Sequence, residues 1–109
     1  MVKLTVMYNL PPDADHAEFI RWRTTEHQAA NMTMPGLIKS DFYVIKEGWP
    51  GKKAPYSYLT EAYFPDMDAF QKAFFESGFQ ARLTESLNRI ADPIFLISEE
   101  VISETVNDW

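Results

Sequence analysis

The sequence predicts an α+β domain whose elements follow the order β-α-β-β-α(α)-β. Three observations support this class. Short stretches at the start, middle and end of the chain are rich in apolar residues with strand periodicity. Two longer stretches between them begin with helix-capping residues, and turn-forming residues separate the elements. With 109 residues and 46% hydrophobic content, residues 1–109 have the length and the core-forming material of a single domain.

The first strand and the first helix have clear boundaries in the sequence. Residues 2–9 alternate between apolar and polar side chains, which is typical of a half-buried strand, and Pro11-Pro12 ends the pattern. Asp15 is the expected N-cap of a helix, with Glu18 as its capping-box partner three residues later. We expect this helix to run to about Asn31.

Two strands and an exposed connection follow. Residues 37–46 form the predicted second strand, with apolar residues on both of its faces. Residues 47–55 are dense in glycine, proline and lysine, which indicates an exposed loop. Residues 56–64 form the predicted third strand.

The second helical region is predicted in two parts. Pro65 to Asp68 opens the first part, where Asp66 or Asp68 supplies a favourable negative charge. Ser77 to Gln80 is a second capping box, so we expect a helix to restart there and to run to about Ala91. Asp92-Pro93 then ends the helix, and Ile94–Ile102 is the last strand, followed by a polar tail over residues 103–109.

This order is the ferredoxin-like arrangement, a four-stranded antiparallel sheet with helices on one face. The last strand has Phe95 and Ile97 on one side and Ile94 and Leu96 on the other. Strands of this kind are expected to be buried on both faces. Because the helices cover only one face, we expect the other face to be covered by a second copy of the chain in a homodimer.

Composition excludes several classes of function. Ten basic and sixteen acidic residues give a net charge of −6, which disfavours binding to nucleic acid. The apolar runs are too short to span a bilayer, and no signal peptide is evident, so we expect a soluble cytoplasmic protein without membrane association. The absence of cysteine excludes disulfides and thiolate chemistry. We expect no metal site, because His16 and His27 fall on different helix faces.

The densest ionisable cluster lies beside the apolar stripe of the first helix. At ~100° per residue, Arg23, Glu26 and His27 lie ~40°, ~−20° and ~80° from Phe19. Charges near an inward face must pair, hydrogen-bond or line a wet cavity. The cluster is therefore either an ion pair or part of a site.

His27 is the leading acid–base candidate, since an imidazole titrates near neutral pH. The alternative is a histidine held structurally by a hydrogen bond, whereas His16, in the first turn, is expected to be solvated. For Arg23 we favour an ordinary helix-surface ion pair with Glu26. Glu26 remains a candidate to orient His27 or Arg23.

Aromatic and acidic residues supply the remaining candidates for substrate binding. Trp22 is either core or a ligand wall. Tyr8 and Tyr58 are the tyrosines we expect at a cavity, although most tyrosines suit packing or a dimer interface equally well. Glu61 is a further polar candidate, for which outward exposure is the favoured alternative.

Several short motifs, spread over nearly the whole chain, have a distinctive order and spacing. They are Tyr8-Asn9-Leu10-Pro11, Phe19-x-x-Trp22 followed by His27, Met34-Pro35-Gly36-Leu37, Tyr58 to Phe64, Ser77-Gly78-Phe79-Gln80 and Ala91-Asp92-Pro93. Together they resemble the EthD family of the dimeric α+β barrel superfamily. The resemblance implies a ferredoxin-like protomer whose sheets pair into a barrel, with a cavity for small hydrophobic molecules.

The resemblance specifies the fold more closely than the reaction. Superfamily relatives include cofactor-free monooxygenases, polyketide cyclases, lactone isomerases and haem-handling enzymes. His27, Trp22 and Pro35-Gly36 match family positions. The leading hypothesis is a binding protein or enzyme that handles hydrophobic organic compounds in catabolism or secondary metabolism. As an enzyme it would be a cofactor-free oxidoreductase, cyclase or isomerase that uses His27. The alternatives are a non-catalytic carrier dimer and a haem-associated protein.

Overall fold

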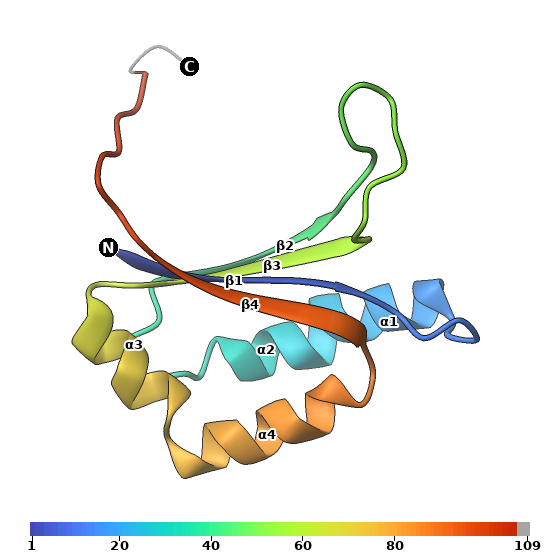
Figure 1. Cartoon of the computed structure of the whole chain (residues 1–109). Coiled ribbons are helices and arrows are strands. Elements are labelled where there is room, and N and C mark those ends of the chain that lie inside the picture. The colour runs from blue at the N-terminus through green and yellow to red at the C-terminus, as the bar shows by residue number, and fades with distance from the viewer. Residues whose placement is uncertain (107–109) are drawn as a thin grey trace.

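Four antiparallel strands form one sheet in the order β2-β3-β1-β4 (Figure 1). The computed structural model describes residues 1–106. The strands are β1 (Val2–Asn9), β2 (Lys39–Val44), β3 (Tyr58–Phe64) and β4 (Ala91–Glu99). The order confirms the predicted α+β class and the predicted sequence of elements, with the two edge positions occupied by β2 and β4.

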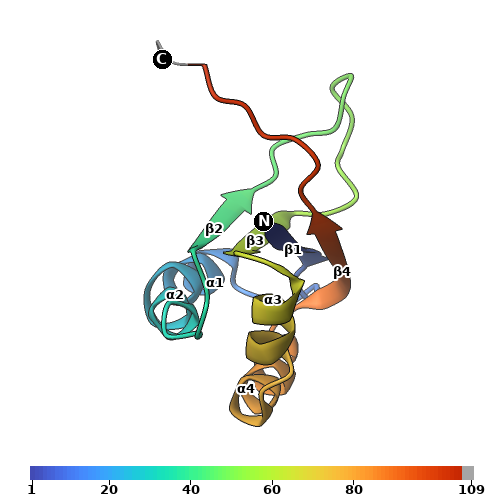
Figure 2. The same cartoon turned by 90° about the vertical axis from the view of Figure 1, so that its left-hand side faces the viewer.

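The helices all lie on one side of this sheet, as two perpendicular views show (Figures 1 and 2). The first helical segment is continuous and comprises α1 (His16–Trp22), the π-helical turn η1 (Arg23–His27) and α2 (Gln28–Asn31). The second comprises α3 (Met67–Phe74) and α4 (Ser77–Leu87). Within residues 1–106, no helix combines the length and the apolar composition needed to cross a bilayer.

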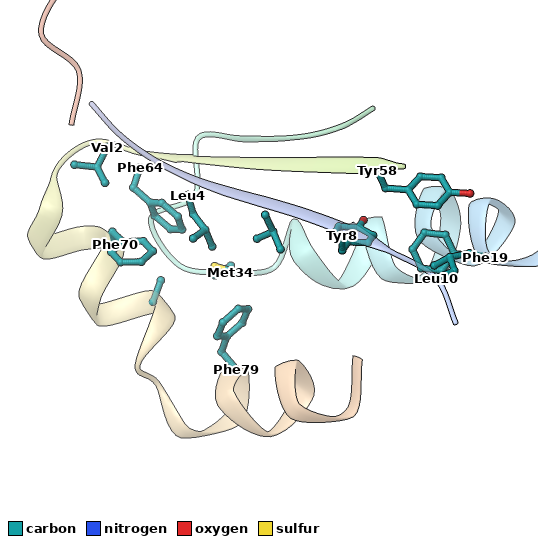
Figure 3. Close-up of a cluster of buried hydrophobic side chains, with 12 residues drawn as sticks. Val2, Leu4, Tyr8, Leu10, Phe19, Met34, Tyr58, Phe64, Phe70 and Phe79 are labelled. Carbon is teal, nitrogen blue, oxygen red and sulfur yellow. The ribbon is translucent and has the colours of Figure 1, made fainter. Parts of the chain in front are cut away.

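The core lies between the sheet and these helices, and the alternation of the first strand predicted it correctly. Every second side chain of β1 is buried, from Val2 to Tyr8. Phe19 from α1, Phe70 from α3 and Phe79 from α4 pack against this face (Figure 3). The apolar stripes of three helical segments therefore share one layer with the inward side of the sheet.

Two helix N-caps are also where the sequence predicts them. The side chain of Asp15 accepts a hydrogen bond from the Glu18 backbone N–H at 3.1 Å. The side chain of Asp66 accepts one from the Ala69 backbone N–H at 2.8 Å, which identifies Asp66 rather than Asp68 as the cap of α3. These bonds satisfy donors that have no partner within the helix.

The predicted capping role of Ser77 is wrong. The cap of α4 is Glu76, whose carboxylate accepts from the backbone N–H groups of Gly78 and Phe79, both at 2.8 Å. These two bonds hold the pKa of the Glu76 carboxyl below its usual range. The longer side chain of Glu76 reaches both donors from the preceding residue, so Ser77 is already the first helical residue. The helix also ends earlier than predicted, at Leu87.

The last strand starts earlier than predicted because Asp92-Pro93 lies inside it. Asp92 has a φ of 55°, in the left-handed region, and the pairing with β1 shifts between Met7 and Asn9. A bulge at an edge strand tolerates a proline because the ladder is already interrupted there. The strand therefore runs from Ala91 to Glu99 rather than from Ile94 to Ile102.

The second and third strands are shorter than predicted, at Lys39–Val44 and Tyr58–Phe64. The segment that joins them extends past the sheet on the side away from the helices, and so does the chain after β4 (Figures 1 and 2). The described part of the predicted tail, residues 103–106, is exposed. Residues 107–109 lie outside the described part of the chain.

The face of the sheet opposite the helices is uncovered in the single chain. Ile94 and Leu96 of β4 are 37% and 47% exposed on this face, and Tyr43 of β2 is 52% exposed. The expectation that the outer strands carry apolar residues on both faces is therefore confirmed. The homodimer inferred from it remains a prediction.

The two aspartates at the start of α3 offer a matched test of this local structure. Asp66→Ala is expected to lower the free energy of unfolding by ~1 kcal/mol, because the Ala69 N–H loses its acceptor. Asp68→Ala removes only an exposed ion pair with Lys72, and ~0.5 kcal/mol or less is expected. Urea denaturation followed by circular dichroism measures both, and equal losses would contradict the assignment of the cap.

Candidate functional site

A cavity of about 300 Å³ lies between the sheet and the two helical segments. Side chains from β1, β2, β3 and β4 line one side of it, and side chains from the first helical segment and from α3 and α4 line the other. Most of the lining is apolar and aromatic. The polar part includes His27, Arg23, Arg82 and Arg89, so ionisable groups are brought to an otherwise apolar space.

The helix that carries the candidate residues contains a π-helical turn from Arg23 to His27. Two consecutive threonines in this turn bond back to the preceding turn. Thr24 Oγ1 donates to the Ile20 carbonyl at 2.7 Å, and Thr25 Oγ1 donates to the Arg21 carbonyl at 2.6 Å. Such bonds satisfy carbonyls that a change of helical pitch displaces, and they commonly bend helices.

The predicted surface pair of Arg23 with Glu26 is wrong, because Arg23 is buried, and the π-helical turn also changes the direction of Glu26 relative to the predicted wheel. Arg23 is 2% exposed, whereas the Glu26 side chain is 65% exposed. The partner of Glu26 is Arg21, whose Nη1 lies 3.2 Å from Glu26 Oε1. A helical wheel at ~100° per residue assumes regular pitch, and η1 breaks that assumption at these residues.

Arg23 lies beneath the sheet among neutral partners. Its Nη1 donates to Gln28 Oε1 at 2.7 Å, and its Nη2 contacts Thr60 Oγ1 at 3.5 Å. The guanidinium carbon lies 4.9 Å from the centroid of the Phe42 ring. Among the ion pairs found within residues 1–106, none includes Arg23.

Tyr8 lies beside the Arg23 guanidinium and does not neutralise its charge. Its hydroxyl is 3.0 Å from Thr60 Oγ1, and burial raises the pKa of Tyr8 above its usual value. The phenol is therefore uncharged at neutral pH. Burial lowers the pKa of Arg23, but an arginine starts so high that it stays protonated. The cavity thus holds a positive charge without a fixed counter-ion.

His27 reaches the same cavity from the end of the π-helical turn. Its ring centroid is 4.4 Å from that of Trp22, and the Arg89 guanidinium carbon lies 4.2 Å from the Trp22 ring. Burial is the largest cause, and together with the positive charges of Arg23, Arg89 and Arg82 it lowers the pKa of His27 to about 4. The imidazole is consequently neutral at pH 7. Within the described part of the chain, it makes no side-chain hydrogen bond.

The cavity brings together most of the candidates from the sequence. Tyr8, Trp22, Arg23, Glu26 and His27 all line it, with Glu26 at its exposed edge. Their roles in binding or catalysis remain predictions.

Two candidates lie outside this lining. The hydroxyl of Tyr58, whose side chain is 2% exposed, is 2.5 Å from Nδ1 of His16. His16 is exposed, as expected, and its contact with Tyr58 is an addition to that expectation. Glu61 is on the face of the sheet away from the helices, so its outward direction is as expected, but its carboxylate lies 2.6 Å from Lys3 Nζ and is only 14% exposed.

Sequence reasoning missed several polar residues of the cavity. Thr60 lies on the same face of β3 as Tyr58 and Phe64, so a hydroxyl on a buried strand face was the available signal. Arg82 and Arg89 are separated by about two helical turns, which places them on one side of the second helical region. Gln28 offered no local signal, because its role depends on contacts with Arg23 and Ser40.

Metal binding finds no support in the side-chain arrangement. Across residues 1–106, no group of three or more histidine, aspartate or glutamate side chains is placed to hold a metal ion. The acidic residues of the cavity, Glu26 and Glu85, do not converge with His27 in such a group.

The lowered pKa of His27 predicts a pH-dependent stability. In the unfolded chain His27 titrates near ~6.5, but in the folded chain its pKa is about 4. Between these values the unfolded state binds more protons, so the free energy of unfolding falls as pH is lowered through this window. The slope is expected to be below ~1.4 kcal/mol per pH unit, because His27 is only partly buried.

Urea denaturation of the wild type and of His27→Gln from pH 7 to pH 4.5 measures this contribution. The wild type should lose stability relative to the variant as pH falls. Parallel curves would contradict the lowered pKa.

Comparisons with known proteins agree with this architecture. No curated protein sequence matches the chain. An EthD family protein from Bacillus halodurans is 22% identical and covers 93% of this chain and 99% of its own, with a TM-score of 0.74. HapK from Hahella chejuensis is 22% identical, covers 97% of this chain and 98% of its own, and also has a TM-score of 0.74.

A third match is SnoaB from Streptomyces nogalater, described as a cofactor-independent oxygenase. It is 19% identical and covers 94% of each chain, with a TM-score of 0.68. These structures support the ferredoxin-like fold, and the first confirms the resemblance to EthD. The model of the family described as REDY-like protein HapK matches residues 2–101, and the chain belongs to this family.

Proposed function

We propose that this protein binds a small, largely apolar organic molecule between the sheet and the helices and transfers a proton on that molecule without a cofactor. The observation that carries the proposal is the neutral imidazole of His27 in a mostly apolar cavity of about 300 Å³. This volume is at the lower end of typical ligand pockets. Aromatic walls such as Trp22, Phe74 and Phe95 suit a flat substrate.

The electrostatics of the cavity support proton removal from a carbon or oxygen acid. A neutral imidazole is the form of histidine that accepts a proton. Negative charge that develops on the substrate as the proton leaves would be stabilised by the arginines around the cavity. The same charge would offset the effect of Arg23, Arg89 and Arg82 on His27, and would so raise the pKa of the base.

The likeness to SnoaB supports a cofactor-free variant of this chemistry, since that protein is described as a cofactor-independent oxygenase. Fold likeness alone does not specify a reaction. Proton transfer is therefore the part of the proposal that this chain's own residues carry. The competing function is a carrier that binds the same class of compound and leaves it unchanged, with His27 serving only to pack against Trp22.

We also propose that the protein acts as a homodimer. The exposed apolar residues Ile94 and Leu96, on one edge strand, and Tyr43, on the other, are on the sheet face that no helix covers. Burial of such a surface is favourable, and a two-fold axis allows the same face to be used by both copies.

Deuterium exchange tests the catalytic proposal. A methyl ketone with an apolar ring, 2-acetylnaphthalene, is incubated with the protein in deuterium oxide, and incorporation next to the carbonyl is followed by mass spectrometry. The wild type is expected to accelerate exchange at least ~100-fold over buffer, which is the usual contribution of a positioned base. His27→Gln should retain binding and return the exchange rate to that of buffer.

A second variant separates His27 from Glu26, which is on the same helical segment and also lines the cavity. Glu26→Gln should keep the wild-type exchange rate, because Glu26 is exposed and bonded to Arg21. Binding of the ketone without accelerated exchange in the wild type would favour the carrier function instead.

Sedimentation analysis tests the dimer. The wild type is expected to sediment as a species of two chains of 12.6 kDa each. Leu96→Lys places a charge on the uncovered sheet face and should yield a monomer, whereas Phe75→Lys, an exposed position at the end of α3, should leave the dimer intact. A wild type that sediments as a single chain at micromolar concentration would contradict the proposal.

A further inference from the structure

We infer that the molecule bound in this cavity carries an acidic oxygen, as a carboxylate, phenolate or enolate, and that Arg23 is the residue that selects it. The inference rests on the proposed small-molecule function and deepens it by naming the chemical class of the ligand. It arises from the position of one charged side chain that the fold buries without a charged partner.

The burial of Arg23 is the first step. Arg23 is 2% exposed, yet it lines the cavity rather than the solid core. An isolated charge in an apolar environment is strongly disfavoured unless it is paired or extensively hydrogen-bonded. A chain that keeps an arginine in such a position gains from it only when something with a negative charge approaches.

The acidic groups near the cavity do not pair with Arg23. Glu85, on α4, is exposed and forms no ion pair with Arg23 among the described residues. Glu26 is bonded to Arg21 at the exposed edge of the cavity. Tyr8 is an uncharged phenol, because burial raises its pKa. The nearby Phe42 ring, 4.9 Å from the guanidinium carbon, supplies a favourable contact without supplying a charge.

The guanidinium also has donors to spare. Of its five N–H groups, one donates to Gln28 at 2.7 Å and another makes a long contact of 3.5 Å with Thr60. Nε makes no hydrogen bond within the described residues, and since no side-chain N or O atom there is both buried and without a partner, Nε keeps some accessible surface at the cavity that Arg23 lines. This N–H, together with the charge of the guanidinium, matches an oxygen of a carboxylate, an enolate or a phenolate.

The charges around the cavity support the same inference, although the chain as a whole is negatively charged. The net charge of the protein is −6, which disfavours anions in general. The cavity is lined by Arg23, Arg82 and Arg89 against Glu26 and Glu85, and Glu26 is already paired. The lining therefore carries more positive than negative charge, with Arg23 buried and Arg82 and Arg89 exposed.

A matched pair of probes tests the inference on the unmodified protein. The probes are 2-naphthoate and 2-naphthamide, which share ring and shape and differ in charge, and binding is measured by isothermal titration calorimetry at pH 7. The wild type is expected to bind naphthoate at least ~10-fold more tightly than naphthamide, as a charge-assisted hydrogen bond to a buried donor implies. Equal affinity would overturn the inference while leaving the proposed small-molecule function intact.

Three variants locate the preference. Arg23→Gln keeps a polar side chain near Gln28 and Thr60 and should abolish the preference for naphthoate, with naphthamide affinity changed by less than ~3-fold. Lys72→Gln is the control, since it removes an equal charge from an exposed ion pair with Asp68, neither of which lines the cavity, and it should keep the preference. Loss of the preference in Arg89→Gln but not in Arg23→Gln would overturn the assignment to Arg23.

A second readout on the wild type does not depend on the folding of any variant. Naphthoate beside Arg23 should raise the pKa of His27, measured by the NMR shift of its ring protons, and naphthamide should not. A preference for naphthoate without any effect on His27 would place the anion elsewhere and overturn the inference. Failure of both probes to bind would overturn the small-molecule function together with it.

Discussion

The placement of one guanidinium beneath the sheet is the constraint on which the site depends. Arg23 follows the buried Phe19 by one regular helical turn, with its backbone N–H bonded to the Phe19 carbonyl, and therefore lies on the inward side of the helix. The π-helical turn begins at Arg23, and Thr24 and Thr25 bond back to carbonyls of the preceding turn. Gln28, in the same helical segment, and Thr60, from β3, accept hydrogen bonds from the guanidinium, so its own helix and the opposite layer of the fold hold the charged donor at the cavity.

The charge of Arg23 also contributes to the protonation state of His27. Burial and the neighbouring arginines keep His27 neutral. In the free protein the imidazole is therefore able to accept a proton, but it is a weak base. Under our proposals, an anionic ligand beside Arg23 would change this balance, because it would offset the charges that disfavour imidazolium. Binding and base strength would then be coupled, and the histidine would become a stronger proton acceptor only when the cavity is occupied.

Sequence reasoning succeeded where the signal is local and periodic. The alternation of β1, the caps at Asp15 and Asp66 and the order of elements follow from short-range rules. It failed for the pairing of Arg23 with Glu26, because three-residue spacing was preferred over the inward direction that the helical wheel gave Arg23. It also failed for the direction of Glu26, because a helical wheel assumes constant pitch and η1 departs from it. It also missed Thr60, whose role depends on a contact 37 residues away from Arg23 in the chain, and it misjudged Asp92-Pro93, because only the edge position of β4 makes a proline there acceptable.

The bulge at the start of β4 also affects how the sheet can associate. An edge strand with regular spacing offers unpaired backbone groups on which another strand can add. β4 does not offer a regular row of backbone groups near its first residues. Asp92 is in the left-handed conformation there, and the following Pro93 has no N–H to donate. The other edge, β2, spans only Lys39–Val44 and carries charged side chains at Lys39 and Asp41. Lateral growth of the sheet into a ribbon of many chains is therefore disfavoured at both edges. The uncovered face, where Ile94, Leu96 and Tyr43 are exposed around the Lys3–Glu61 ion pair, is the surface on which the proposed self-association would occur.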